Sequence, residues 1–217
     1  MYNLAYFKEN DIAVVKKFML QNPFAILSGC DADQHPVATQ VPLLIEEKDN
    51  KLFLQGHIMK QTDHHRAFLH NPNVLAIFTG PHTYVSASWY SNPLQASTWN
   101  YMTVHAKGVL QFLDEKALFN TLQKTTAHFE NDEHSPSLFE KLPGEYVERL
   151  TKAIIAFEIE VTGIDNVFKL SQNRDEKSYR NIIEHLQKGD EASNQVASEM
   201  KLRNSQVFQT INDQQSP

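Results

Sequence analysis

Two cations flank the start of a short predicted helix in the stretch QGHIMKQTDHHRAFLHNP, residues 55–72. Lys60 lies just before this helix and Arg66 lies within it. The free backbone N–H groups at the start of a helix attract anions, and neighbouring cations strengthen that attraction. The stretch therefore predicts a phosphate-binding site. The simpler alternative is a pair of solvated surface cations.

Four of the ten histidines lie in the same stretch, at positions 57, 64, 65 and 70, which raises the question of a metal site. His64 and His65 are adjacent on a helix, so their side chains point about 100° apart and cannot easily share one ion. No HExxH pattern is present, and the single cysteine, Cys30, excludes a cysteine-based zinc site and an internal disulfide. We expect partly exposed imidazoles and no metal.

Patterns typical of covalent catalysis or nucleotide binding are absent. Ser86, Ser88 and His105 would allow a catalytic triad on paper, but no GxSxG nucleophile elbow supports one. The patterns GxGxxG and GxxxxGK[ST] are missing too, which argues against a Rossmann or P-loop site. The motifs therefore name no catalytic residue.

Both tryptophans, Trp89 and Trp99, lie in TGPHTYVSASWYSNPLQASTWNY, residues 79–101. Three tyrosines accompany them among Ser, Pro, Asn and Thr, and this setting indicates loop and turn. The aromatics either fill a core or form a wall against which a planar ligand docks. The segment lies between two predicted strands, where a barrel would open, and this position favours the wall.

The composition limits the class of protein. The chain has 217 residues, 41% of them hydrophobic, and a formal net charge of −6, which argues against sequence-blind nucleic-acid binding. No apolar run approaches the ~20 residues that cross a membrane. Residues 1–18 carry charges where a signal peptide needs an apolar stretch. We expect a cytoplasmic protein without a membrane segment.

Residues 103–113 and 153–161 alternate between apolar and polar side chains, as half-buried strands do. The other predicted strands are residues 24–30, 37–47, 52–58 and 74–78. Predicted helices cover residues 10–20, 62–70, 118–129 and 146–150. Several of the six strands follow one another without helices between them. This order predicts a mainly β fold with flanking helices, its antiparallel sheet closed or nearly closed into a barrel.

The chain changes character at Asp175. Apolar positions recur at helical spacing on both sides of Gly189, which predicts a helical hairpin over residues 175–203, appended to a domain of residues 1–174. Residues 204–217 have little to bury, so we expect a disordered tail.

The hairpin also has the outline of a helix-turn-helix, in which Ser193, Asn194 and Gln195 could reach base edges. Seven basic residues between positions 169 and 204 face six acidic ones, so the hairpin carries almost no net charge. This balance favours an ordinary hairpin that packs on the barrel.

Four phrases resemble one protein family: NPFAIL, GHIMKQTDHHRAFLHNPNVLAIFTGPHTYVSASWY, TWNYMTVHAKG and FKLSQNR. The chain resembles the PaiB-type FMN-binding proteins, also described as FMN-binding negative transcriptional regulators, from about residue 1 to residue 200. The resemblance implies the split β-barrel of pyridoxamine-phosphate-oxidase-like flavoproteins, FMN as cofactor, and a homodimer with flavin at the subunit interface. Ala87 and Ser97 stand where the family commonly has proline.

The resemblance also implies roles for individual residues. Lys60 and Arg66 would bind the FMN phosphate, with Thr62 as a hydroxyl donor. Residues that shape the ring pocket or bond the polar edge of the ring would be Trp89, Trp99, Tyr101, Ser86, Ser88 and Asn100.

The resemblance favours a transcriptional repressor, with DNA as a partner through the family alone. A flavin-dependent oxidoreductase on the same barrel is the alternative. A haem-binding or haem-degrading protein is a third reading, because relatives on this barrel degrade haem and histidines are plentiful here.

Overall fold

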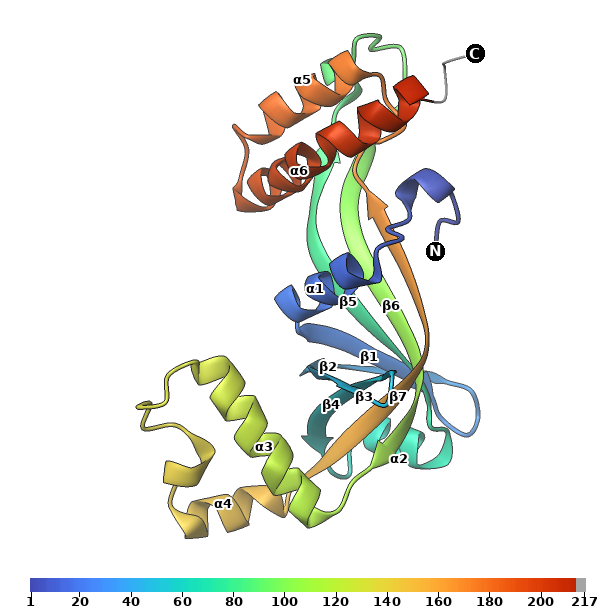
Figure 1. Cartoon of the computed structure of the whole chain (residues 1–217). Coiled ribbons are helices and arrows are strands. Elements are labelled where there is room, and N and C mark those ends of the chain that lie inside the picture. Colours follow the sequence, from blue (N-terminus) through green and yellow to red (C-terminus); the bar gives the residue numbers. More distant parts are fainter. Residues whose placement is uncertain (214–217) are drawn as a thin grey trace. The chain divides into compact units, whose positions relative to one another are not determined.

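Seven antiparallel strands form the sheet, in the order β2-β1-β5-β6-β7-β4-β3 (Figure 1). The computed structural model describes residues 1–213. The strands are β1 Phe24–Cys30, β2 Pro36–Pro42, β3 Leu44–Lys48, β4 Lys51–Met59, β5 Asn73–Val85, β6 Thr98–Phe112 and β7 Ile154–Lys169.

Six α-helices and three short 3-10 helices accompany the sheet within the described residues. The α-helices are α1 Ile12–Gln21, α2 Asp63–His70, α3 Glu115–Glu130, α4 Gly144–Thr151, α5 Glu176–Leu186 and α6 Glu191–Asp213. The 3-10 helices are η1 Ala5–Phe7, η2 Ala87–Trp89 and η3 Phe139–Lys141. No helix in this part of the chain is long and apolar enough to cross a membrane.

The chain divides into two units by compactness. We call residues 19–78 and 105–165 the barrel unit, and residues 1–18, 79–104 and 166 onward the terminal unit. Strands β5, β6 and β7 contribute residues to both units. Residue 174 lies within the terminal unit, and the predicted division there stays a prediction.

The barrel unit contains the predicted split barrel. Antiparallel hairpins join β1 to β2 and β3 to β4, and β4 also pairs with β7. Strands β2 and β4 stand near opposite ends of the strand order, yet they contact each other. Leu27, Leu54 and Ile159 are fully buried on the inner face. The curled sheet confirms the predicted fold class.

The strand predicted over residues 37–47 is wrong in one respect, because the structure divides it into β2 and β3. Pro42 ends β2, since proline has no N–H with which to continue a ladder. Leu43 follows with 1% of its surface exposed, and its N–H donates to the carbonyl oxygen of Pro23 at 2.9 Å. The sheet therefore has seven strands where six were predicted.

The loop predicted over residues 79–101 is wrong at both of its ends. Strand β5 continues to Val85 and β6 begins at Thr98. Thr83 and Val85 are buried while His82 and Tyr84 are exposed, so the segment alternates as a strand should. Only residues 86–97 remain outside the strands, with η2 among them.

Helices α5 and α6 lie side by side in the terminal unit and confirm the predicted hairpin (Figure 1). The Tyr179 hydroxyl donates to the carbonyl oxygen of Met200 at 2.9 Å, and both residues are fully buried. The Phe208 ring contacts the Tyr179 ring edge-on at 5.2 Å. This contact helps to explain why α6 continues to Asp213, through residues 204–213 that were predicted to be disordered. The last four residues of the predicted tail lie outside the described part.

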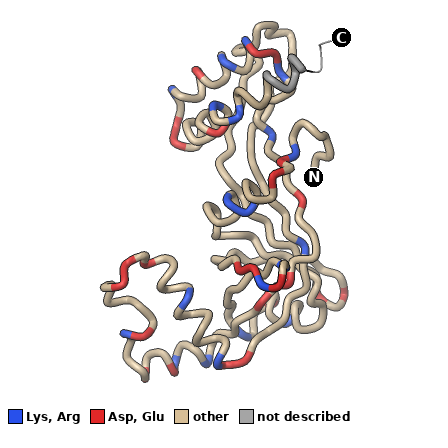
Figure 2. Tube along the Cα trace, in the orientation of Figure 1, with Lys and Arg blue, Asp and Glu red and all other residues tan. Residues whose placement is uncertain are grey.

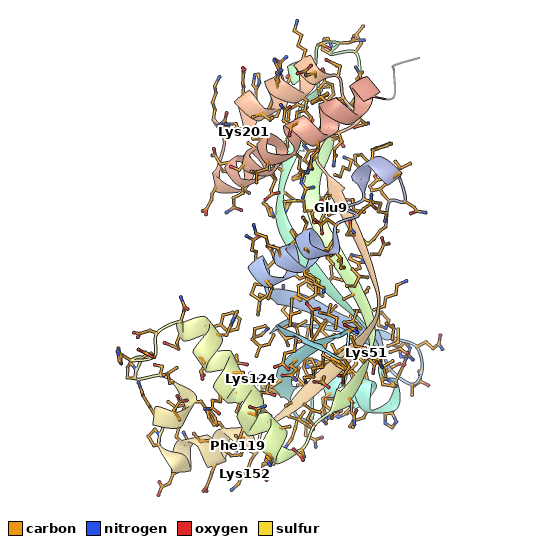
Figure 3. The ribbon with its side chains drawn as sticks, in the orientation of Figure 1. Glu9, Lys51, Phe119, Lys124, Lys152 and Lys201 are labelled. Atoms are coloured by element: carbon orange, nitrogen blue, oxygen red, sulfur yellow. The ribbon has the colours of Figure 1, made fainter. Side chains whose placement is uncertain are left out.

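The terminal unit also ties the start of the chain to α6. The backbone N–H of Glu9, labelled in Figure 3, donates to Asn166 Oδ1 at 2.8 Å, and Asn166 Nδ2 donates to the Glu9 carbonyl at 2.9 Å. Arg203 Nη1 lies 2.5 Å from Glu9 Oε2, and both side chains are about 15% exposed. These contacts join three segments that are distant in sequence.

Candidate functional site

Strands β5 and β6 present four rings on one side of the terminal unit. We call His82, Tyr84, Trp99 and Tyr101 the aromatic face. The Trp99 ring lies 6.1 Å from His82 and 6.0 Å from Tyr84, the latter edge-on. Trp99 is 53% exposed although tryptophan is among the most apolar side chains. A large exposed ring surrounded by other rings is typical of a binding surface.

An open hollow of about 270 Å³ lies on the aromatic face. Its lining residues are Thr79, Gly80, His82, Trp99, Tyr101, Met102 and Thr103. A Cβ at Gly80 would lie 2.6 Å from Cε2 of Phe18, so any side chain there would have to displace that ring. Glycine therefore permits the close packing beneath the hollow.

The lining suits a flat ring with polar edges. Trp99 and Tyr101 supply ring surface, while the Thr79 and Thr103 hydroxyls and the His82 imidazole supply hydrogen-bonding groups. Burial raises the pKa of Tyr101, and nearby Tyr2 adds to this shift, so the Tyr101 hydroxyl stays protonated and can donate. The hollow is smaller than the roughly 300–1,000 Å³ of pockets that enclose a cofactor-sized ligand. It would cover only part of an FMN molecule.

Asn100 lies on the opposite face of β6 from Trp99 and Tyr101. Its side chain has no exposed surface, its Oδ1 accepts from the Ser171 hydroxyl at 2.9 Å, and its Nδ2 lies 3.5 Å from Met200 Sδ. Strand alternation causes this separation. The Asn100 amide therefore contacts buried residues in this structure. Its predicted hydrogen bond to the polar edge of a flavin ring stays a prediction.

Ser86, Ser88 and Trp89 belong to η2 and its cap. The Ser86 hydroxyl accepts from the backbone N–H of Ser88 and lies 2.8 Å from the Ser88 hydroxyl. Trp89 stacks on His185 of α5, with ring centroids 5.0 Å apart and planes 12° apart. None of these three residues lines the hollow. Their predicted roles are untested.

The two positions that depart from the family phrases contact each other. The backbone N–H of Ala87 donates to the Ser97 hydroxyl at 2.9 Å. Proline at position 87 would have no N–H to donate, and proline at 97 would have no hydroxyl to accept. The hydrogen bond therefore supplies some of the stiffness that two prolines would give to the ends of this segment.

The predicted phosphate ligands lie together in the barrel unit. Lys60 Nζ donates to the carbonyl oxygen of Lys152, labelled in Figure 3, at 3.3 Å, and Arg66 Nη2 donates to the carbonyl of Gln61 at 2.8 Å. The Thr62 hydroxyl donates to the Met59 carbonyl and accepts from the N–H of His65, so it caps α2. In the described part of the chain, the hydrogen bonds of the two cations go to neutral carbonyls.

The pKa of His65 reports the electrostatic field at this helix start. Burial lowers this pKa, and the positive charges of His64, Lys60 and Arg66 lower it further. Asp63 is the acidic residue in the first turn, and its carboxylate accepts from the N–H of His64 at 2.8 Å. Lys60 and Arg66 therefore favour an anion at this helix start, and the Asp63 carboxylate opposes one.

The nine residues predicted to bind the cofactor fall into two groups, which belong to different units. Lys60, Thr62 and Arg66 belong to the barrel unit, and the other six belong to the terminal unit. Trp99 and Tyr101 line the hollow, and their predicted contact with a flavin stays a prediction. His82 and Thr103, which the sequence pattern did not single out, line the hollow as well. The missed signal is the alternation of residues 82–85, which continues the strand beyond the apolar run.

A cluster of ligand-type side chains that the sequence prediction missed lies in the β1–β2 turn. Ligand atoms of Asp31, Asp33 and His35 lie within 4.8 Å of one another. Asp31 Oδ1 accepts from the backbone N–H groups of Asp33 and His35 at 2.9 and 2.8 Å. These bonds explain the cluster as a turn.

The curled seven-stranded sheet with its helices belongs to the class of split-barrel folds. Residues 1–163 match the family model described as "Putative FMN-binding domain", and the chain belongs to this family. FMN is the cofactor that defines the family.

Similar proteins agree with this assignment. The chain is 35% identical to "Protease synthase and sporulation protein PAI 2" of Bacillus subtilis (strain 168), over 86% of this chain and 89% of that protein. The fold is similar to that of the flavocytochrome Anf3 from Azotobacter vinelandii (TM-score 0.55, 14% identity, 77% of this chain, 72% of that chain). It is also similar to the FAD and heme binding protein from Mycobacterium smegmatis (TM-score 0.51, 16% identity, 75% and 73%). These two structures share the fold.

Proposed function

We propose that the chain is an FMN-binding regulator of gene expression, a repressor that acts in the cytoplasm. One observation carries the binding role. The hollow on the aromatic face is lined by the rings of Trp99 and Tyr101, the His82 imidazole and the hydroxyls of Thr79 and Thr103. Such a lining suits the binding of a flat ring with polar edges.

In the proposed complex, Trp99 and Tyr101 of the terminal unit contact a flavin ring. Lys60 and Arg66 of the barrel unit are the candidates for binding a flavin phosphate. FMN would supply a reversible redox response that a regulator can report. The chain's own part is to hold the ring, neutralise the phosphate and keep the Tyr101 hydroxyl protonated for hydrogen bonding.

The small hollow supports a homodimer. It would cover only part of a flavin, and more than half of Trp99 is exposed. A second copy of the chain would cover the remaining ring surface and remove the exposed apolar area from water.

The regulatory role is supported by the relative named for protease synthesis and sporulation. Both signs of charge occur along α5 and α6 (Figure 2), so one copy of this hairpin offers no basic stripe. Ser193 is buried and its hydroxyl lies 2.9 Å from that of Thr83, which leaves Asn194 and Gln195 as exposed candidates for base contact. DNA binding would therefore need a basic surface assembled from two copies.

The test combines cofactor binding, mass and DNA binding on the full chain. FMN fluorescence should be quenched on titration with the protein, and light scattering should give the mass of a dimer. Selection from random duplexes at physiological salt should then enrich one sequence. Absence of FMN binding after reconstitution would remove the cofactor role. Absence of DNA binding even at low salt would remove the regulatory role.

The exposure of Trp99 also favours a second candidate, a flavin-dependent oxidoreductase. A ring docked on an open surface can be reached by a soluble reductant. Repeated, substrate-dependent oxidation of NADH or NADPH by the FMN-loaded protein would support this function. A flavin that binds but is reduced by neither donor would count against it.

A further inference from the structure

Lys169, at the end of β7, is half-buried and makes its hydrogen bonds only to neutral groups in the described contacts. Its Nζ donates to the hydroxyl of Thr98 and to the carbonyl oxygen of Trp99, the latter at 2.6 Å. The same ammonium lies 5.9 Å from the centre of the Phe7 ring. A charged group removed from water usually has an opposite charge beside it. None of these partners supplies one.

A second cation lies close enough to influence Lys169. Burial lowers the pKa of Lys169, and the positive charge of Arg174 lowers it further. The Arg174 guanidinium donates to Gln95 Oε1 and lies over the Tyr90 ring, 4.3 Å from its centre. These partners are neutral too. The two cations therefore repel each other across a region that has no compensating carboxylate among their recorded partners.

Asp175, the acid next to Arg174 in sequence, makes its hydrogen bonds to other residues. Its Oδ2 accepts from the hydroxyls of Ser91 and Ser178, and its Oδ1 accepts from the backbone N–H of Ser178. These bonds hold the carboxylate at the N-cap of α5. The recorded hydrogen bonds of the Asp175 carboxylate therefore cap α5 and do not involve Lys169 or Arg174.

The side chain of Tyr90, which contacts Arg174, carries a buried hydroxyl. Tyr90 is 4% exposed, and its hydroxyl has no hydrogen-bond partner in the described part of the chain. The ring that carries this hydroxyl is the one that Arg174 covers. A buried donor without an acceptor is costly, because it has lost its bonds to water. An acceptor supplied by a ligand would remove this cost.

We propose that Lys169 and Arg174, beside the segment of residues 91–98, bind an oxyanion group such as the phosphate of a small molecule. Lys169 bonds Thr98 and Trp99, and Arg174 bonds Gln95, so both cations lie beside this segment. Arg174 also covers the ring of Tyr90, whose hydroxyl lacks a partner, and an oxyanion is a group that cations and a hydroxyl can bond. The phosphate candidates at Lys60 and Arg66 belong to the other unit. The inference does not depend on FMN binding, because the cations and their partners are part of the apo chain.

Inorganic phosphate is the probe. In a Trp89→Phe background, Trp99 is the single tryptophan, and its carbonyl bonds Lys169 directly. Phosphate added to the apo protein at constant ionic strength, with chloride as the matched salt, should change Trp99 emission in a saturable way. Lys169→Gln, which keeps a hydrogen-bond donor but loses the charge, should weaken phosphate binding roughly tenfold. Arg174→Gln should weaken it similarly.

Lys201→Gln is the matched control. Lys201, labelled in Figure 3, is exposed on α6 in the same unit, so its loss removes one charge without touching the proposed site. Circular dichroism would verify the fold of each variant. Phosphate affinity unchanged in both the Lys169 and Arg174 variants, or equally reduced by Lys201→Gln, would overturn the proposal. So would a response that chloride reproduces.

A repeat with FMN-loaded protein identifies the source of the oxyanion. If phosphate still binds, the site serves a second phosphorylated ligand. If FMN blocks phosphate, and Lys169→Gln weakens FMN but not riboflavin, the oxyanion is the phosphate of the flavin. Failure of FMN to bind at all would contradict the proposed function while leaving the phosphate result intact, so the two failures are distinguishable.

Discussion

Trp99 and Asn100 are neighbours on β6, yet 53% of the Trp99 surface is exposed and none of the Asn100 surface is. Strand alternation puts the first on the aromatic face and the second in the interior. We therefore expect a substitution at Trp99 to affect mainly ligand binding. A substitution at Asn100 should affect mainly the stability of the fold.

Trp99→Ala should weaken FMN binding while leaving the fold largely intact. Because Trp99 is half-exposed, the loss in unfolding free energy should fall below the 3–5 kcal/mol typical of a buried Trp, at about 2 kcal/mol or less. FMN fluorescence titration and urea denaturation measure the two effects. Trp89→Phe is the control, since Trp89 stacks on His185 and does not line the hollow. Unchanged FMN affinity in Trp99→Ala would exclude the aromatic face as the ring site.

Asn100→Ala should lower the unfolding free energy by about 1–3 kcal/mol, because the buried Ser171 hydroxyl loses its acceptor. Ser171→Ala should restore part of this loss in the double variant, since both partners are then removed. Urea denaturation of the two single variants and the double variant gives the coupling. Additive losses would show that the Asn100–Ser171 bond contributes little.

Arg66→Gln should weaken FMN binding by roughly tenfold and leave riboflavin binding unchanged, because riboflavin lacks the phosphate. Parallel fluorescence titrations with the two flavins measure the difference. The matched control is Lys51→Gln, which removes a charge from the same unit, where Lys51 already pairs with Glu160 at 2.7 Å. Equal weakening of both flavins would mean that Arg66 supports the fold rather than the phosphate.

Gly108→Ala should destabilise the barrel unit. A Cβ at Gly108 would lie 2.5 Å from the carbonyl oxygen of Glu160 and would also collide with Ile159 on the neighbouring strand β7. Backbone cannot yield as a flexible side chain can, so we expect a loss of about 1–3 kcal/mol. Thermal and urea unfolding measure it. Gly163→Ala is the control, because a Cβ there meets no atom within 4 Å. Equal effects of the two substitutions would contradict the steric reason.

Stability should fall as the pH is lowered from 7.5 to 5. Burial lowers the pKa of His57 below its ordinary value of 6.5, and the pKa of buried His65 is lowered too. The unfolded chain therefore binds protons more readily than the folded chain, and stability present above pH 6.5 is lost as the pH falls toward the folded values.

His57→Gln should flatten this pH dependence, as measured by urea midpoints between pH 7.5 and 5. The range lies above the ordinary pKa values of Asp and Glu, so carboxylates contribute little to the slope. An unaltered slope in His57→Gln would assign the pH dependence to other groups.

Local pattern predicted much of the fold. The alternation of residues 103–113 and 153–161 placed the cores of β6 and β7, and the apolar stripes around Gly189 placed α5 and the first part of α6. Boundaries were less accurate where polar side chains lie within a strand. Residues 79–85 were predicted as loop because His82 and Tyr84 interrupt the apolar run, yet they belong to β5. Residues 204–213 were predicted to be disordered because they have little to bury. Their single phenylalanine, Phe208, contacts Tyr179 on α5, and the local sequence does not show this contact.

The sequence by itself determined the family, the split barrel and the aromatic character of the segment around Trp99, because motifs, periodicity and composition are local properties of the chain. The tertiary structure decided which side chains share a face and which are committed to other partners. It placed His82 beside Trp99, directed Asn100 to Ser171, and gave Lys169 and Arg174 neutral hydrogen-bond acceptors. These relationships join residues far apart in the sequence, and only the packing of the strands and helices brings them within reach.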